Sequence, residues 1–382
     1  MNTPIAPPSR LRAIDLLRGL TIAFMIMANN NGGPHAWWAF KHADWNGFTP
    51  TDLVFPTFLF LVGVAIVYST AARFARGDSR STVLTHALWR AGMLFVFGLV
   101  VNSFPHIDLA TMRFYGVLQR IAACYLLATA IYLWLPSWRV WLGVIVAALL
   151  GYWWLMRFVP VPGLGLPVRD IPLLDPDANL AAWLDRQLFS AAHLYERTRD
   201  PEGLLSTLPA LATTAIGILA GQWLRSTRDL PRKVRGLLLA GLACVALGAL
   251  WNLGFPINKK LWTSAYVLFA GGWSVLLLAF FLWAVDIAKP AGPDRRPPAW
   301  QMPLRVLGTN AIFAYMLSEL LAAGLWNIHL ADGRPVADVI GTAFETTLGQ
   351  NGFMALTYAL LYLAVCWVPT YVLYRRGIFL KV

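Results

Sequence analysis

The chain has 382 residues, of which 58% are hydrophobic and 13% are charged. Soluble domains carry about 25% charged residues, and a soluble fold of this length could not cover so much apolar surface, so the composition predicts an integral membrane protein in contact with the lipid bilayer. The formal net charge is +12, but the basic residues lie between apolar runs and form no basic domain, which argues against a nucleic-acid partner.

Apolar runs of roughly 20 residues, the length that crosses a bilayer as a helix, recur along the whole chain. They predict an all-α protein of about ten transmembrane helices in one domain, residues 1–382, with spans at 14–31, 53–72, 84–103, 114–135, 138–158, 204–224, 234–253, 262–286, 304–326 and 351–374. Every second connection is rich in lysine and arginine, so the positive-inside rule puts both termini on the cytoplasmic side. The residues that set this orientation are Arg10, Arg12, Arg73, Arg76, Arg80, Arg225, Arg228, Arg232, Lys233, Lys289, Arg295, Arg296, Arg375, Arg376 and Lys381.

The connection between the first two spans carries the densest group of polar residues. Asn29, Asn30 and Asn31 end the first apolar run, where their amides need hydrogen-bonding partners. His42 lies ten residues before Asp52, which can cap the next helix. A histidine beside a carboxylate is a candidate general base. The alternative is a well-capped interfacial loop with an ordinary histidine.

Two charged residues fall inside apolar spans, where charge is costly and usually functional. Arg120 lies about two turns into the fourth span, and Glu319 lies about two turns from the outer end of the ninth. We hypothesise that both line one polar cavity with His42 and Asp52. The alternative is a structural ion pair between Arg120 and Glu319.

A long connection at about 159–203 lies on the outer side in this scheme. Prolines prevent a helix in its first part. Apolar residues then recur at helical spacing from Leu180 to Tyr195, with Asp185 on the opposite face. This pattern predicts an amphipathic helix on the outer membrane surface.

The three cysteines, Cys124, Cys244 and Cys366, lie inside apolar runs. Their positions match neither a disulfide framework nor a metal-binding motif, so we expect no metal site. The first apolar run is not followed by a small-residue cleavage site, which predicts a retained helix rather than a cleaved signal peptide.

The string KHADWNGFTPTDLVFPTFLFLVGVAI, which contains His42 and Asp52, resembles the signature of the heparan-alpha-glucosaminide N-acetyltransferase family, including its bacterial transmembrane acyltransferase members. Further similar stretches follow in the same order at 10–26, 115–127, 200–210, 257–268 and 308–319. The resemblance therefore covers most of the chain.

The resemblance implies a transmembrane acyltransferase-like bundle that takes acetyl groups from cytosolic acetyl-CoA. The acceptor would be the amine of glucosamine or a related amino sugar on the other face. His42 matches the family's active-site histidine, Asp52 matches the aspartate that follows it, and Asn30 or Asn31 matches an asparagine at the end of the first helix. We expect a homodimer in a bacterial inner membrane.

In this chemistry neutral His42 removes a proton from the acceptor amine, while Asp52 holds the imidazole tautomer. An amide of Asn30 or Asn31 donates to the oxyanion. In an alternative route His42 is the nucleophile and forms an acetyl-imidazole.

The remaining candidates receive binding roles. Arg18 contacts a phosphate of CoA or pairs with Asp15, one turn away. Asn310 lines the acyl tunnel or makes a hydrogen bond between helices. The residues expected to contact the sugar are Asn258, Lys259 and Trp262.

Two other functions stay open at this point. Ten spans and a polar midplane also suit an inner-membrane transporter of amino sugars such as N-acetylglucosamine, although paired broken helices in two related halves are not evident. A third possibility is acyl transfer to the hydroxyl of another envelope glycan.

Overall fold

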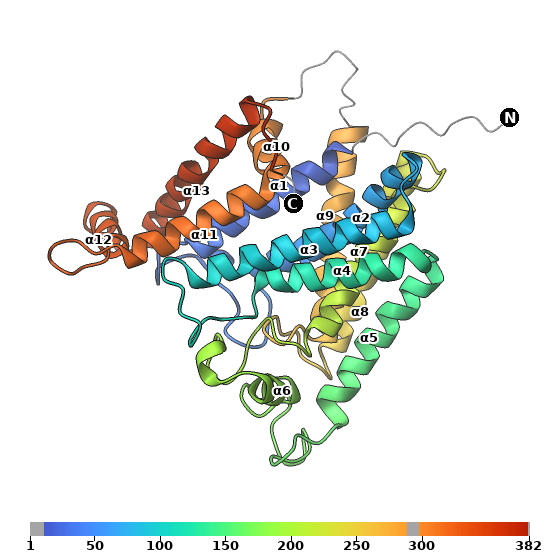
Figure 1. The fold of residues 1–382 in the computed structure, drawn as a ribbon, viewed down its shortest axis with the longest axis horizontal. Helices are drawn as coiled ribbons and strands as arrows, with labels where there is room; N and C mark the ends of the chain where they lie inside the picture. The colour runs from blue at the N-terminus through green and yellow to red at the C-terminus, as the bar shows by residue number, and fades with distance from the viewer. Residues whose placement is uncertain (1–10, 289–297, 381–382) are drawn as a thin grey trace.

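A computed structural model describes residues 11–288 and 298–380, and the regular elements within these ranges are helices (Figure 1). The long helices are α1 (Arg12–Asn29), α2 (Val54–Ala75), α3 (Arg80–Ser103), α4 (Val117–Trp134), α5 (Trp138–Phe158), α7 (Thr207–Leu224), α8 (Leu230–Trp251), α9 (Ser264–Leu282), α11 (Ala311–Asn327) and α13 (Gly352–Arg375). The shorter helices are α6 (Leu180–Leu188), α10 (Gln301–Thr309) and α12 (Val336–Leu348). Single turns complete the set: η1 (Trp38–Phe40), η2 (Pro50–Leu53), η3 (Ala191–His193) and the π-helical η4 (Trp283–Ile287).

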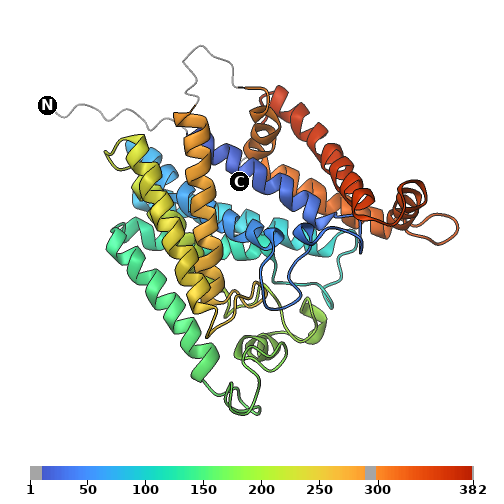
Figure 2. The same cartoon turned by 180° about the vertical axis from the view of Figure 1, so that it is seen from behind.

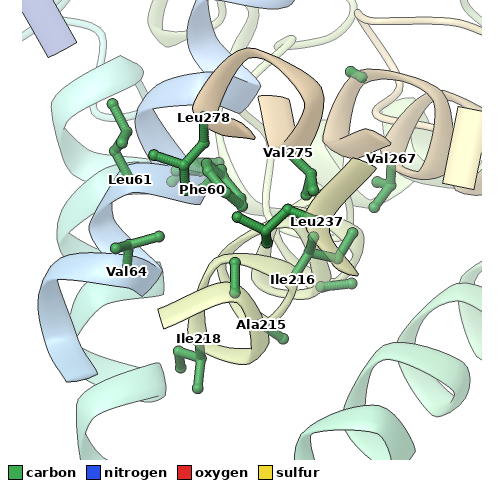
Figure 3. Close-up of a cluster of buried hydrophobic side chains, with 14 of the residues drawn as sticks. Phe60, Leu61, Val64, Ala215, Ile216, Ile218, Leu237, Val267, Val275 and Leu278 are labelled. Carbon is green, nitrogen blue, oxygen red and sulfur yellow. The ribbon is translucent and has the colours of Figure 1, made fainter. Parts of the chain in front are cut away.

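Several helices that pack together are far apart in the sequence. α2 packs along α7 and α1 along α10, while α3 and α4 are neighbours in the chain and in space. Figure 2 shows α8 and α9 side by side on the opposite face of the bundle. The main core lies where α2, α7, α8 and α9 meet; it includes Phe60, Leu61, Val64, Ala215, Ile216, Ile218, Leu237, Val267, Val275 and Leu278 (Figure 3).

The contact between α2 and α7 depends on two glycines. A Cβ atom added to Gly217 would lie 1.9 Å from the carbonyl oxygen of Phe60, and one added to Gly63 would lie 2.0 Å from that of Thr214. Small residues of this kind let membrane helices approach closely. Because α2 begins directly after the turn that holds Asp52, this contact also positions the candidate site.

Helices lie at each of the predicted spans, with a correction at the ninth. By length and composition, eight of the described helices can cross a membrane. α10 and α11, predicted as one straight span at 304–326, are bent by 84° and together would make a ninth. α1 carries Arg12, Asp15 and Arg18 within 18 residues, so it is less apolar than the others. The chain is therefore an all-α, multi-pass membrane protein, and the count of ten spans stays a prediction.

The bend between α10 and α11 falls at Asn310, whose side chain is buried. Its Nδ2 donates to the carbonyl oxygen of Ile378 at 3.1 Å, and its Oδ1 accepts from the N–H of Leu380 at 3.0 Å. The Asn310 amide thus holds the segment that follows α13. Neither of these hydrogen bonds joins two helices, so they are not the interhelical bond that was predicted for Asn310.

The outer connection is helical over a shorter range than predicted. α6 ends at Leu188 and only the single turn η3 follows, so the predicted helix as far as Tyr195 is wrong. Asp185 does not face away from the protein either: it is 1% exposed and accepts from the backbone N–H groups of Asp200 and Leu204 at 3.3 Å. Burial raises the pKa of Asp185 to about 6. α6 therefore packs inward, among the loops at one end of the bundle (Figure 1).

The two described ends of the chain lie at the same end of the bundle. Arg12, at the start of α1, and Arg375, at the end of α13, line one cavity. This agrees with an even number of crossings, and the cytoplasmic position of both termini stays a prediction. Arg10, Lys289, Arg295, Arg296 and Lys381 lie outside the described residues.

Candidate active site

The loop between α1 and α2 brings His42 and Asp52 into contact. Nδ1 of His42 lies 2.6 Å from Oδ1 of Asp52. The Asp52 side chain is fully buried, whereas 43% of the His42 side chain is exposed. If the carboxylate is ionised, Nδ1 carries the proton and Nε2 keeps its lone pair. Nε2, the nitrogen that Asp52 does not contact, is then the basic one.

The Asp52 carboxylate is held from several sides. Its Oδ2 accepts from the backbone N–H groups of Ala43 at 3.1 Å and Thr49 at 3.0 Å, and it lies 3.1 Å from the Thr49 hydroxyl. Thr49 and Asp52 form a capping box at the start of η2. Tyr266 of α9 donates to the Asp52 carbonyl oxygen at 2.7 Å. These contacts fix the carboxylate, and through it the imidazole ring.

The loop between α8 and α9 lies beside the loop between α1 and α2 (Figure 2). Gly47 donates its N–H to the carbonyl oxygen of Ile257 at 2.8 Å, and Asn258 Nδ2 donates to Asn46 Oδ1 at 3.1 Å. Nζ of Lys259 then lies 3.3 Å from Nε2 of His42. Lys259, one of the three residues expected to contact the sugar, thus contacts Nε2 of His42.

Asn258 and Trp262 are both fully buried, so neither side chain is open to solvent, and their contact with a sugar stays a prediction. Asn258 is used by hydrogen bonds within the loop and to Asn46. The indole of Trp262 donates to the Thr213 hydroxyl at 3.1 Å and lies under the guanidinium of Arg120. Burial depends on the tertiary fold, so residue type alone could not predict it.

The three asparagines at the end of α1 contact other groups. Nδ2 of Asn30 donates to the carbonyl oxygen of Ile26 at 3.1 Å, and Nδ2 of Asn31 donates to that of Phe40 at 2.9 Å. Asn29 donates to Glu319 at 2.9 Å. In the described ranges none of these amides bonds to His42 or Asp52. The oxyanion role of Asn30 or Asn31 stays a prediction.

Arg120 and Glu319 are not brought together. Arg120 lies in the first turn of α4, not two turns in, because the helix begins at Val117. It donates to the Gly203 carbonyl oxygen at 3.0 Å and to the Ser206 hydroxyl. Over residues 11–288 and 298–380, no ion pair joins Arg120 to Glu319, so that alternative is wrong. The same residues also show no hydrogen bond from either side chain to His42 or Asp52, which leaves their shared cavity unsupported.

Arg120 keeps unused hydrogen-bonding capacity. It is 2% exposed, and within the described part of the chain its Nε and Nη1 have no partner. The neighbouring Gln119 amide is likewise without one there. Buried N–H groups of this kind are costly unless something accepts from them. Arg120 therefore stays a candidate for binding a polar substrate group.

A charge network beside the site was missed by the sequence analysis. Arg113 donates to both oxygens of Asp200, at 2.7 and 2.5 Å, and to Glu202 at 2.5 Å. Burial lowers the pKa of the Arg113 guanidinium, but these carboxylates outweigh it and raise the pKa above its usual value. The family-like stretch at 200–210 contained both acids and was the available signal. Over the described residues, no group of three or more His, Cys, Asp or Glu is placed to hold a metal ion.

A cavity of about 690 Å³ opens between α1, α2, α3, α4 and the α10–α11 bend. Basic residues gather at one end of its lining: Arg18, Arg73, Arg76, His86 and Arg90. The remainder is mostly apolar. Arg18 also bonds to Asp15 at 3.3 Å and to the Gly308 carbonyl oxygen at 3.1 Å, so it makes the predicted pair and lines the cavity as well. His86 and Arg90, one turn apart in an apolar helix, were the missed sign of this cavity.

These features define a multi-pass membrane protein with a histidine–carboxylate pair in a loop and a cavity lined by apolar and basic residues. The family model described as "Heparan-alpha-glucosaminide N-acetyltransferase, catalytic" matches residues 10–250, and the chain belongs to this family. It is 28% identical to the heparan-alpha-glucosaminide N-acetyltransferase of Homo sapiens, over 99% of this chain and 60% of that protein. It is 29% identical to the Mus musculus protein of the same name, over 82% of this chain and 54% of that protein. The chain thus spans little more than half the length of these relatives.

Proposed function

We propose that this protein transfers an acetyl group from cytosolic acetyl-CoA to the amine of glucosamine or a related amino sugar on the periplasmic side of a bacterial inner membrane. The observation that carries the proposal is the contact between Nδ1 of the partly exposed His42 and the buried Asp52, which leaves Nε2 as the basic nitrogen. Membership of the N-acetyltransferase family supports the reaction type.

The cavity has the chemistry that acetyl-CoA requires. Arginines bind phosphate groups through charge and paired N–H donors, and Arg73 and Arg76, at the C-terminal end of α2, line the cavity. The apolar lining suits the pantetheine arm. Phe58 and Arg73, both on α2, line the cavity, and at about 1.5 Å of rise per residue they are about 22 Å apart. That distance is most of a hydrocarbon core of about 30 Å.

The donor and acceptor would meet near the first turn of α2. Phe58 lies between one and two turns beyond Asp52, so the inner end of the cavity approaches the His42–Asp52 pair along this helix. The thioester then enters from the cavity, and the sugar amine enters from the exposed side of His42. Arg120, with its unpaired N–H groups, is available to a polar group of either substrate.

The chemistry follows from the state of His42. The neutral amine attacks the thioester carbonyl, and Nε2 takes a proton from the amine nitrogen as the new C–N bond forms. Asp52 keeps the proton on Nδ1 and stabilises the imidazolium. Breakdown of the tetrahedral intermediate breaks the C–S bond, and the thiolate of CoA takes the proton back from the imidazolium. Amine and thioester become amide and thiol, with no metal ion in the scheme.

The test uses purified protein, radiolabelled acetyl-CoA and glucosamine. We expect labelled N-acetylglucosamine from the wild type and from His35→Ala, which alters an exposed histidine of the same loop. His42→Ala should lose activity by about 10²–10⁴-fold, the usual contribution of a general base. A base-labile O-acetyl product would contradict amine acylation. No turnover by any variant, with uptake of labelled N-acetylglucosamine into proteoliposomes, would favour the transporter.

A further inference from the structure

The contact of Lys259 with His42 suggests a role that sugar binding does not explain. Resting on the proposed function, we infer that the Lys259 ammonium donates a hydrogen bond to the oxyanion that forms as the acceptor amine attacks the thioester. Its Nζ lies 3.3 Å from Nε2 of His42, the nitrogen that must face the reacting amine. A donor beside the base is where the carbonyl oxygen of the tetrahedral intermediate needs one.

The loop around Lys259 is built to hold it in place. Asn258 Oδ1 accepts from the N–H of Leu261 at 2.9 Å, and the N–H of Asn258 donates to the Thr263 hydroxyl at 3.0 Å. Trp262 has φ +53°, a conformation that costs energy in a residue with a side chain. The fully buried Trp262 ring fixes that turn. Lys259 therefore projects from a rigid support, as preorganised stabilisation requires.

Among the described residues, none of the other expected donors bonds to His42. Asn30 donates to Ile26 and Asn31 donates to Phe40, both at the end of α1. Arg120 donates to Gly203 and Ser206 and has no bond to His42 among the residues that the structure describes. Within residues 11–288 and 298–380, Lys259 is the cationic side chain that contacts the imidazole.

An ammonium can serve both the resting and the reacting site. It has three N–H donors on a flexible stem. In the structure one can point to the lone pair of Nε2. When the acceptor amine takes that position, the ammonium turns to the carbonyl oxygen of the acetyl group. Lys259 neither gains nor loses a proton in the step, so the proton still passes from the amine to His42 and then to the CoA thiolate.

The charges around Lys259 determine when it is an ammonium. Burial lowers its pKa below the usual value; the positive charges of Lys260 and Arg120 act in the same direction, and the carboxylates of Glu202 and Asp52 oppose them. An oxyanion donor of this kind is lost as the pH rises through the pKa of Lys259. The rate should therefore fall on the alkaline side, at a pH below the ordinary lysine value of about 10.4.

The first experiment compares Lys259→Met with Lys260→Met in the acetyl-transfer assay. Lys260 is the matched neighbour, because it pairs with Glu196 at 2.9 Å and not with His42. We expect Lys259→Met to lower kcat by about 10²–10³-fold, the cost of one oxyanion donor, with little change in KM for glucosamine. Lys260→Met should retain kcat. A raised KM with unchanged kcat would show sugar binding instead and would overturn the oxyanion role.

The second experiment keeps a positive charge at position 259. Lys259→Arg keeps a donor that does not titrate below about pH 12, so its kcat should no longer fall on the alkaline side. An alkaline fall identical to that of the wild type would contradict the inference, even if Lys259→Met does not fold. Absence of turnover by the wild type would overturn the acetyltransferase and the role of Lys259 together. Normal wild-type turnover with an active Lys259→Met enzyme would overturn the role of Lys259 alone.

Discussion

At the scale of single residues, the candidate site pairs a buried carboxylate, Asp52, with a partly exposed histidine, His42. Asp52 is fully buried and contacts His42, Ala43 and Thr49 through its two carboxylate oxygens. The His42 side chain is 43% exposed and contacts the Asp52 carboxylate through Nδ1. Because the carboxylate cannot move, it selects the tautomer in which Nε2 is basic. The substrate can then approach the base without a rearrangement of the loop.

Asp52→Asn tests this tautomer control. The amide oxygen of the new side chain can still accept from Ala43 and Thr49, so its NH₂ group faces His42 and the proton moves to Nε2. We expect kcat to fall by about 10²–10⁴-fold, while the thermal unfolding temperature changes little. Thr51→Ser, next to Asp52, keeps the hydroxyl that bonds to Ala39 and serves as the control. An Asp52→Asn enzyme with half of the wild-type kcat would contradict the role.

Part of this site could be predicted from the sequence. The interval between His42 and Asp52 and the resemblance around it predicted the pair, because both residues lie in one short connection. The contact of Lys259 with His42 joins residues 217 positions apart, and only the fold creates it. Asn258 and Trp262 resembled sugar-binding residues by type, yet their burial makes them supports of the loop.

At the scale of helices, the close approach of α2 and α7 sets the position of the site. Gly217 meets the backbone of α2 at Phe60, and no larger residue fits there without a shift of one helix. η2, with Asp52, continues directly into α2. A displacement of α2 would therefore reach the carboxylate as well as the core.

Gly217→Ala compared with Gly143→Ala tests the helix contact. The added methyl group at Gly217 would lie 1.9 Å from the Phe60 carbonyl oxygen, whereas Gly143 in α5 has open space around it. We expect Gly217→Ala to destabilise the protein by about 1–3 kcal/mol, as overpacking usually does, and Gly143→Ala to be neutral. The measurement is the unfolding temperature in detergent, and equal temperatures for the two variants would contradict the packing account.

The apolar runs predicted where helices lie but not how they end or bend. The break at Asn310 falls within an apolar stretch, so hydropathy alone could not distinguish it from a straight span. α6 stops at Leu188 although the helical spacing of apolar residues continues. Asp185 of α6 accepts hydrogen bonds from the backbone N–H groups of Asp200 and Leu204. These contacts depend on the folding of a distant segment.

At the scale of the whole molecule, the two ends of the bundle differ in chemistry. The loops around α6 and the α8–α9 connection lie at one end (Figure 1), and Lys259 of that connection contacts His42. Arg73 and Arg76, at the other end of α2, line the cavity of about 690 Å³. The sequence analysis used these arginines only as signals of orientation. Their presence in the cavity supports a second role, the binding of an anionic donor from the cytoplasm.

In the proposed reaction, donor and acceptor enter from opposite sides of the membrane, and sealed proteoliposomes test this most directly. Acetyl-CoA is trapped inside, glucosamine is added outside, and His42→Ala vesicles serve as the control. We predict that N-acetylglucosamine accumulates outside wild-type vesicles only, and that no product forms when both substrates are supplied outside. Product that forms only with both substrates on one side would contradict transfer across the membrane.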